Sequence, residues 1–213
     1  MKIKAVVPIK LNNERFPNKN IALLNGKPLC TYLLNTLSNI EGLETYVYCS
    51  DESITQYLPD NIKFFKRDAR LDNFSVKRQE IVNAMIRDIS ADIYLYAHVT
   101  NPFLTKESIA NAIYHIVHED YDSAIGVTSH RKYIWYKNAP MNFDRDNLLR
   151  TQDIEPVYME MGLYAFRREV ALPNGSVYGD RLRLIPVTDI EAIDIDYKED
   201  LDFANLIIKH QQQ

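Results

Sequence analysis

Short apolar runs alternate along the chain with segments whose apolar residues recur at helical spacing. Five runs of four to six residues predict buried strands: residues 4–9, 45–49, 62–65, 93–98 and 123–127. Apolar positions three or four apart predict helices between them: residues 29–40, 76–89 and 106–117, with a shorter helix from residue 50. This strand–helix alternation predicts an α/β domain with a mostly parallel central sheet flanked by helices.

The alternation stops between residues 132 and 156, where aromatic side chains, asparagines and Pro140 occur without a helical period. This composition predicts a protruding arm over 132–158 rather than a second domain, so 1–213 is expected to form one domain. The regular pattern then resumes. It predicts strands at 162–166 and 192–195 and a last helix from about 199 to 210.

Composition removes several classes of protein. The six glycines are too far apart to build a glycine-rich phosphate loop, and a net charge of −4 does not favour nucleic-acid binding. No apolar run approaches the roughly 20 residues of a membrane span, and the N-terminus lacks the features of a signal peptide. We therefore expect a cytoplasmic protein without a nucleic-acid or membrane partner, and the two cysteines, Cys30 and Cys49, are expected to be buried free thiols.

A basic, polar loop follows the first predicted strand. Residues 8–20 contain Lys10, Arg15 and Lys19 among asparagines, and no glycine. In open α/β sheets, ligands bind beyond the carboxyl ends of the strands, which is where this loop begins. Cationic side chains and amides can hold phosphates without glycine. The loop is thus either a phosphate-binding loop or an ordinary basic surface loop.

An acidic segment lies near the C-terminus. On the predicted strand at 192–195 and its end, Asp194 and Asp196 are two residues apart and would face the same side, with Ile193 and Ile195 toward the core. Two neighbouring carboxylates repel each other unless a cation joins them. Mg²⁺, which binds proteins through one or two carboxylates and substrate phosphates, is a suitable cation. The alternative is that both carboxylates are simply solvated.

Five segments together resemble the CMP-sialic acid and CMP-Kdo synthetases, the acylneuraminate-type cytidylyltransferases. The N-terminal signature of that family is similar to residues 8–20, PIKLNNERFPNKN. Four further matches follow in the same order: GKPL at 26–29, TNP at 100–102, EMGLYAF at 160–166 and EAIDID at 191–196. The resemblance therefore spans nearly the whole chain.

The resemblance implies a Rossmann-like nucleotidyltransferase fold, CTP and Mg²⁺ as ligands, release of pyrophosphate, and a homodimer whose arm reaches toward the neighbouring site. It assigns the triphosphate and nucleotide contacts to Lys10, Asn12, Asn13, Arg15, Lys19, Arg67 and Arg78. It assigns the metal to Asp194 and Asp196, and catalysis to Lys10, Lys19 and Asp196. In-line attack of an acceptor oxygen on the α-phosphorus is chemistry that depends mostly on positioning and charge neutralisation.

The acceptor is the part of the resemblance with most departures. The acceptor-binding positions correspond to His98, Asn101 and Glu160, and the first two replace a glutamine and an aspartate of the family. Lys10 replaces an arginine and so loses a bidentate donor, and Met161 replaces an asparagine. The expected acceptor is an acidic sugar, sialic acid-like or 2-keto-3-deoxy, activated for surface polysaccharide synthesis.

Three alternatives stay open at this stage. Asp194-Ile-Asp196 could be the DxD metal motif of a GT-A-type glycosyltransferase. The acceptor could instead be a phosphonate or phosphorylated compound. The chain could also be a nucleotide-binding relative that has lost activity.

Overall fold

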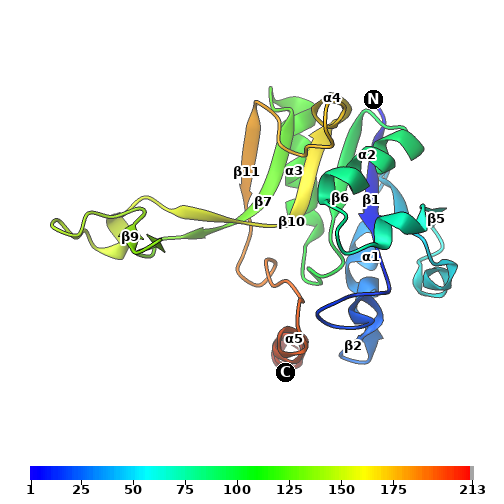
Figure 1. The fold of residues 1–213 in the computed structure, drawn as a ribbon, viewed down its shortest axis with the longest axis horizontal. Helices are drawn as coiled ribbons and strands as arrows, with labels where there is room; N and C mark the ends of the chain where they lie inside the picture. The colour runs from blue at the N-terminus through cyan, green and yellow to red at the C-terminus, as the bar shows by residue number, and fades with distance from the viewer. Residues whose placement is uncertain (212–213) are drawn as a thin grey trace.

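The computed structural model describes residues 1–211, which form a seven-stranded sheet with a long arm (Figure 1). The strands are β1 (Ile3–Pro8), β4 (Glu44–Cys49), β5 (Ile62–Lys66), β6 (Ile93–Ala97), β7 (Ser123–His130), β10 (Val157–Arg167) and β11 (Leu182–Pro186). Their order is β11-β7-β10-β6-β1-β4-β5. Only β10 runs antiparallel to its neighbours, β6 and β7, so the predicted mostly parallel sheet is confirmed.

Helices cover both faces of this sheet because successive side chains of each strand point to opposite sides. The helices are α1 (Cys30–Ser38), α2 (Arg78–Asp88), α3 (Lys106–His118), α4 (Arg168–Ala171) and α5 (Lys198–Gln211). On β1, Ala5 and Val7 pack with buried residues of α1 and α3, whereas Val6 packs with those of α2 and α4. Thr105 caps α3 by accepting a hydrogen bond from the Ser108 amide (3.2 Å).

A smaller apolar cluster lies beyond the carboxyl end of β1. There α5 packs against the hairpin of β2 (Leu23–Leu24) and β3 (Lys27–Pro28), and the two elements lie below the sheet in Figure 1. Ile195 is fully buried in this cluster together with Leu24 and Leu29. The chain that follows the basic loop is therefore fixed to the C-terminal segment.

One predicted strand is absent from the structure, and one observed strand was not predicted. Residues 192–195 form no strand, because Ile193 and Ile195 direct their apolar side chains into the cluster with α5 instead of joining the sheet. The sheet edge is formed by β11, which the sequence analysis missed. Its apolar residues alternate with Arg183 and it ends at Pro186, a pattern typical of a short edge strand.

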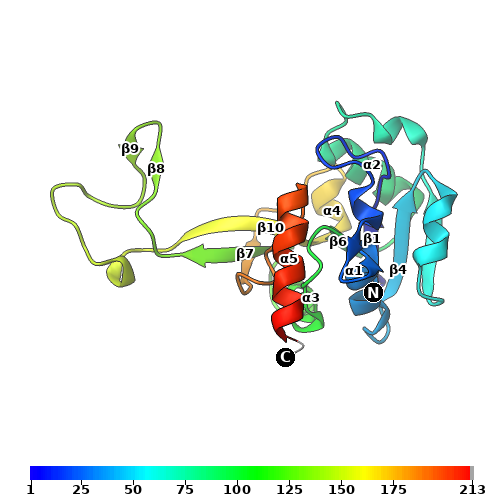
Figure 2. The same ribbon diagram turned by 90° about the horizontal axis from the view of Figure 1, so that it is seen from below.

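Residues 131–156 project from the sheet between β7 and β10 (Figures 1 and 2). The arm contains the hairpin of β8 (Trp135–Tyr136) and β9 (Ala139–Pro140), and the Phe143 ring packs against those of Tyr133 and Trp135 at centroid distances of 4.9 and 5.2 Å. The predicted arm, 132–158, also includes the first residues of β10. Within residues 1–211, no helix is both long and apolar enough to cross a membrane.

Four short 3₁₀ turns complete the chain: η1 (Lys19–Ile21), η2 (Glu52–Tyr57), η3 (Ala69–Asp72) and η4 (Thr151–Asp153). The helix expected from residue 50 is η2, which begins after Asp51 because the Asp51 side chain accepts a hydrogen bond from the Ser53 amide. Both cysteines are buried and free, as expected.

Candidate active site

A cavity of about 310 Å³ opens at the carboxyl ends of β1 and β6. From β1 the chain proceeds through β4 and β5 on one side and then returns to β6 on the other side of β1. The cavity thus lies at the point where the strand order reverses, which is the usual ligand site of an open α/β sheet. Predicted site residues on its wall are Lys10, Asn13, Arg15, Lys19, Arg67, His98, Asp194 and Asp196.

The basic loop and the acidic segment meet in this cavity. Lys19, only 9% exposed, donates hydrogen bonds to the Ile195 carbonyl and to Asp196 Oδ1, both at 2.8 Å. The Arg15 guanidinium donates to the same carboxylate oxygen at 2.7 Å and lies over the Tyr197 ring, 5.3 Å from its centroid. Two predicted phosphate ligands are therefore paired with a predicted metal ligand.

The acidic segment lies outside the sheet and is held by other contacts. The Ile195 amide donates to the Thr100 carbonyl (2.8 Å), and the Asn101 side-chain amide donates to the Ile193 carbonyl (3.1 Å). These bonds fix the backbone on both sides of Asp194. Although the predicted strand is absent, Asp194 and Asp196 still line one cavity, while Ile193 and Ile195 pack in the cluster with α5.

The two carboxylates are a suitable donor set for Mg²⁺. The Asp194 side chain is exposed and has no hydrogen bond or ion pair within residues 1–211, and both partners of Asp196 bind its Oδ1. In the same part of the chain, no cluster of three or more His, Cys, Asp or Glu side chains is arranged to hold a metal. Mg²⁺ on two carboxylates would keep positions for substrate phosphates, the arrangement that this ion favours.

The opposite wall of the cavity carries a buried arginine. Arg67 is 4% exposed, its Nη2 donates to Asp72 Oδ1 at 2.6 Å, and its guanidinium carbon lies 5.8 Å from the Tyr48 ring centroid. The Arg67 Nε is buried and has no hydrogen-bond partner. A buried donor in this state is costly unless a ligand or water satisfies it.

Unpaired buried atoms gather at this site. Across residues 1–211, four side-chain atoms are buried without a partner: Asn13 Oδ1, Asn20 Oδ1, Arg67 Nε and Asn101 Oδ1. The first three belong to residues on the cavity wall. The cavity therefore offers both acceptors and donors to a polar ligand.

Burial alters two titratable groups on the wall. Burial lowers the pKa of His98 below its ordinary value, although Asp194 acts in the opposite direction, and burial thereby favours the neutral imidazole. Burial likewise lowers the pKa of Lys10, whose Nζ lies 4.5 Å from the Phe74 ring centroid. The His98 ring lies against Tyr96 and Tyr164, at centroid distances of 5.3 and 5.9 Å.

Four predicted site residues do not line the cavity: Asn12, Asn101, Arg78 and Glu160. The Asn12 side chain turns toward η3 and donates to the Asp72 carbonyl (3.4 Å), so the structure does not bring it to the other triphosphate contacts. Asn101 is fully buried, donates to the Ile193 carbonyl and lies against Gly162, so the structure does not place it among the residues that line the cavity.

Arg78 and Glu160 form a separate cluster that the sequence analysis did not connect. They pair at 3.1 Å, and Glu160 also accepts hydrogen bonds from the hydroxyls of Tyr164 (2.6 Å) and Tyr178 (2.8 Å). Burial would raise the pKa of Glu160, but these hydrogen bonds outweigh it and lower the pKa. The cluster adjoins the cavity through Tyr164, which contacts His98.

A cationic cavity with two carboxylates at the switch point of a mostly parallel α/β sheet is the arrangement of a nucleotide-binding enzyme. The family profile described as "Cytidylyltransferase" matches residues 5–211, and the chain belongs to this family. The family predicted from the sequence is therefore confirmed, and family membership disfavours the glycosyltransferase alternative.

Characterised relatives are distant in sequence but similar in length. The chain is 23% identical to the pseudaminic acid cytidylyltransferase of Campylobacter jejuni subsp. jejuni serotype O:2, over 98% of this chain and 97% of that protein. It is also 23% identical to the 3-deoxy-manno-octulosonate cytidylyltransferase of Acaryochloris marina, over 98% of each chain.

Solved structures show the same fold. One is a CMP:2-keto-3-deoxy-manno-octonic acid synthetase complexed with CTP, with a TM-score of 0.74, 14% identity and coverage of 99% of this chain and 100% of the other. Another is the 4-diphosphocytidyl-2C-methyl-D-erythritol synthase of Anaerococcus prevotii, with a TM-score of 0.68, 16% identity and coverage of 98% and 96%. The predicted nucleotidyltransferase fold is confirmed.

Proposed function

We propose that this protein transfers the cytidylyl group of CTP to a hydroxyl of an acidic sugar, giving a CMP-sugar and pyrophosphate. The observation that carries the proposal is the cavity, where Lys10, Arg15 and Lys19 lie opposite Arg67 and beside two carboxylates. The relatives named for pseudaminic acid and 3-deoxy-manno-octulosonate support an acidic sugar as acceptor.

The reaction follows from the charges of the cavity. The acceptor oxygen forms a bond to the α-phosphorus, the bond between the α-phosphorus and the bridging oxygen breaks, and the hydroxyl proton is released to solvent. Lys10, Arg15 and Lys19 would neutralise the charge that accumulates on the departing pyrophosphate. Arg67 would hold the cytosine, because its unpaired Nε is a donor suited to a carbonyl or ring nitrogen.

Asp194 and Asp196 would hold Mg²⁺. When bound, this ion supplies positive charge beside the phosphates and lowers the pKa of the attacking hydroxyl. Arg15 and Lys19 now pair with Asp196, so a triphosphate that engages these cations would leave more of the Asp196 carboxylate available. Because CTP is a cytoplasmic metabolite, we also propose a cytoplasmic location.

Pyrophosphate release tests the proposal. The protein is incubated with CTP, Mg²⁺ and separate acceptors: pseudaminic acid, 3-deoxy-manno-octulosonate, sialic acid and a phosphonate. Pyrophosphate formed with one of the acidic sugars, and abolished by EDTA, is the expected result. Pyrophosphate release with the phosphonate alone would show that the acceptor is a phosphonate and not an acidic sugar. CTP binding without turnover of any acceptor would indicate a non-catalytic relative.

We further propose that the arm pairs with a second copy of the chain. It exposes large apolar side chains with no core of its own, among them Trp135 (55%), Tyr136 (59%) and Met141 (59%). Aromatic residues and methionine are enriched in protein interfaces. The double variant Trp135→Glu/Tyr136→Glu should be monomeric in light scattering where the native chain is dimeric. Leu172→Glu, an equally exposed residue of the body (58%), is the control.

A further inference from the structure

The metal-binding carboxylates of the proposed site lie on a segment that the sheet does not hold. Residues 193–196 belong to no helix or strand. Two carboxylates aimed into one cavity need a fixed backbone, because ligand geometry must be kept to a fraction of an ångström. Other groups must therefore hold this segment in place.

Asn101 and its neighbour Thr100 hold the segment on both sides of Asp194. The Asn101 side chain is fully buried, and its Nδ2 donates to the Ile193 carbonyl at 3.1 Å. The Thr100 carbonyl accepts from the Ile195 amide at 2.8 Å. Since only the Nδ2 of an asparagine can donate to a carbonyl, this contact also fixes which way the side-chain amide faces.

Gly162 on β10 provides the space that Asn101 occupies. A Cβ at position 162 would lie 2.3 Å from Asn101 Oδ1 and 2.8 Å from His98 Cβ, closer than real contacts allow. The glycine thus permits Asn101 to lie between β10 and the acidic segment. In this position Asn101 is fully buried and does not line the cavity.

We propose that Asn101 is a positioning residue that orients Asp194 and Asp196 for the cation, rather than an acceptor contact. The identity of the cation and nucleotide rests on the proposed function. An aspartate at this position would place a carboxylate against the Ile193 carbonyl, where it cannot donate and is repelled. Residues that orient metal ligands typically change metal affinity about 10–100-fold when replaced.

Calorimetric titration of CTP, once with Mn²⁺ and once with EDTA, tests this role without requiring turnover. The native chain should bind CTP more tightly with Mn²⁺, and the ratio of the two dissociation constants reports the contribution of the metal. In Asn101→Asp this ratio should be about 10–100-fold smaller, and the dissociation constant measured in EDTA should be unchanged. Gly162→Ala displaces Asn101 without changing its chemistry, so it should also reduce the ratio. It replaces Asn101→Asp as the test if that variant does not fold.

A matched control separates positioning from general loss of structure. Leu104, 1% exposed in the same loop after β6, contacts the core, so Leu104→Ala should lower the melting temperature and preserve the Mn²⁺ ratio. An unchanged ratio in both Asn101→Asp and Gly162→Ala, or no Mn²⁺ effect in the native chain, would overturn the inference. A higher KM for the acceptor with a native ratio would overturn it in favour of acceptor binding.

The two proposals fail in different ways. If the native chain shows the Mn²⁺ effect but releases no pyrophosphate with any acceptor, the proposed function is wrong, and the Asn101 variants still decide the inference. If pyrophosphate is released and the Asn101→Asp ratio stays native, the function holds and the inference is wrong.

Discussion

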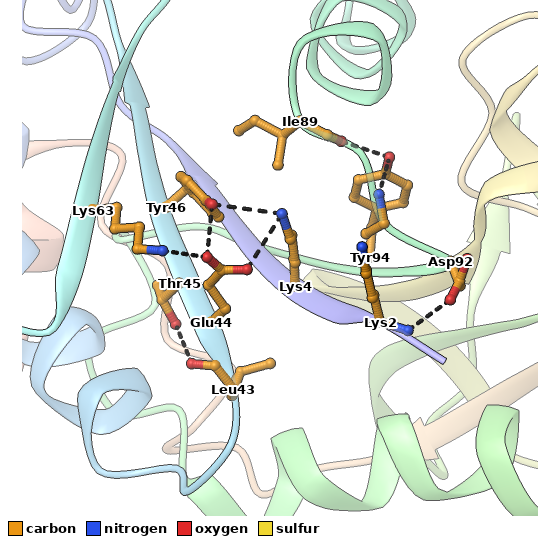
Figure 3. A network of polar contacts seen from close by, with 11 residues as sticks. Lys2, Lys4, Leu43, Glu44, Thr45, Tyr46, Lys63, Ile89, Asp92 and Tyr94 are labelled. Atoms are coloured by element: carbon orange, nitrogen blue, oxygen red, sulfur yellow. Dashed lines mark hydrogen bonds and ion pairs between the residues drawn. The ribbon is translucent and has the colours of Figure 1, made fainter.

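Charged side chains gather at both ends of the central sheet, and the two groups differ in how they are paired. At the amino end, Lys4, Glu44, Tyr46 and Lys63 form a network across β1, β4 and β5 (Figure 3). Glu44 accepts a hydrogen bond from Tyr46 at 2.8 Å and pairs with Lys4 at 3.3 Å and with Lys63. Every charged group of this network has a partner.

The carboxyl end holds similar residue types in a different state. Arg15 and Lys19 share one carboxylate oxygen, and Lys10 has an aromatic ring beside it but no ion pair within residues 1–211. The cavity also contains buried polar atoms without partners, such as the Arg67 Nε. Unsatisfied buried groups are costly in a folded protein unless a ligand or water satisfies them. Incomplete pairing, more than charge itself, therefore marks the candidate site.

Asp196→Asn should have the largest effect on the site at the carboxyl end, because it removes the anion shared by Arg15 and Lys19. Metal charge stabilisation contributes several kcal/mol, so we expect a loss of about 10³-fold in the rate of pyrophosphate release. CTP affinity measured in EDTA should be kept or increased, since both cations lose a competing partner.

The control for this change is Asp202→Asn on α5. Asp202 is exposed, pairs with Lys198 at 2.8 Å and lies outside the cavity, so its loss should leave turnover unchanged. Near-native turnover of Asp196→Asn would show that the carboxylate has no role in the reaction.

Arg67→Lys tests the buried wall of the cavity with a smaller expected effect. Lysine keeps the charge beside Asp72 but lacks the guanidinium Nε, the unpaired donor. A hydrogen bond to a charged group contributes about 1.5–3 kcal/mol, so the KM for CTP should rise about 10–100-fold and the preference for CTP over UTP should fall. Arg70→Lys, an exposed change in the neighbouring turn, is the control. A native KM for CTP in Arg67→Lys would show that Arg67 does not recognise the base.

The sequence predicts the strands, the large helices and the site residues that lie close together along the chain. The basic loop after β1 and the alternation of Asp194 and Asp196 were readable because both depend on local pattern and on a general rule about sheet edges. The predicted strand at 192–195 was wrong, yet its consequence for the carboxylates held. Both carboxylates line one cavity while Ile193 and Ile195 pack in the cluster with α5, although the segment belongs to no strand.

The parts that the sequence did not show depend on contacts between distant segments. Only the antiparallel insertion of β10 between β6 and β7 brings Glu160 to Arg78 and Gly162 to Asn101. Neither pairing has a local signature, since the residues of each pair are more than 60 positions apart. For the same reason the resemblance to the family assigned Asn101 to the acceptor, because the sequence does not show that the residue packs between Gly162 and the Ile193 carbonyl.

Glu44→Gln tests the fully paired network at the amino end of the sheet, and its expected effect is the smallest of those predicted here. The hydrogen bonds from Lys63 and Tyr46 lower the pKa of Glu44 to about 2, from 4.5 in an unfolded chain. The folded state therefore favours the carboxylate, and its contribution is complete above pH 4.5 and is lost as the pH falls toward 2. Because the pair is partly exposed, the free energy of unfolding should drop by less than about 1 kcal/mol at pH 7. Urea unfolding at pH 7 and pH 3 should show the difference between native and variant chains shrinking at low pH, with pyrophosphate release at pH 7 unchanged. Reduced pyrophosphate release in Glu44→Gln would mean that the two ends of the sheet are coupled. A fully paired charged network would then contribute to the reaction as well as to stability.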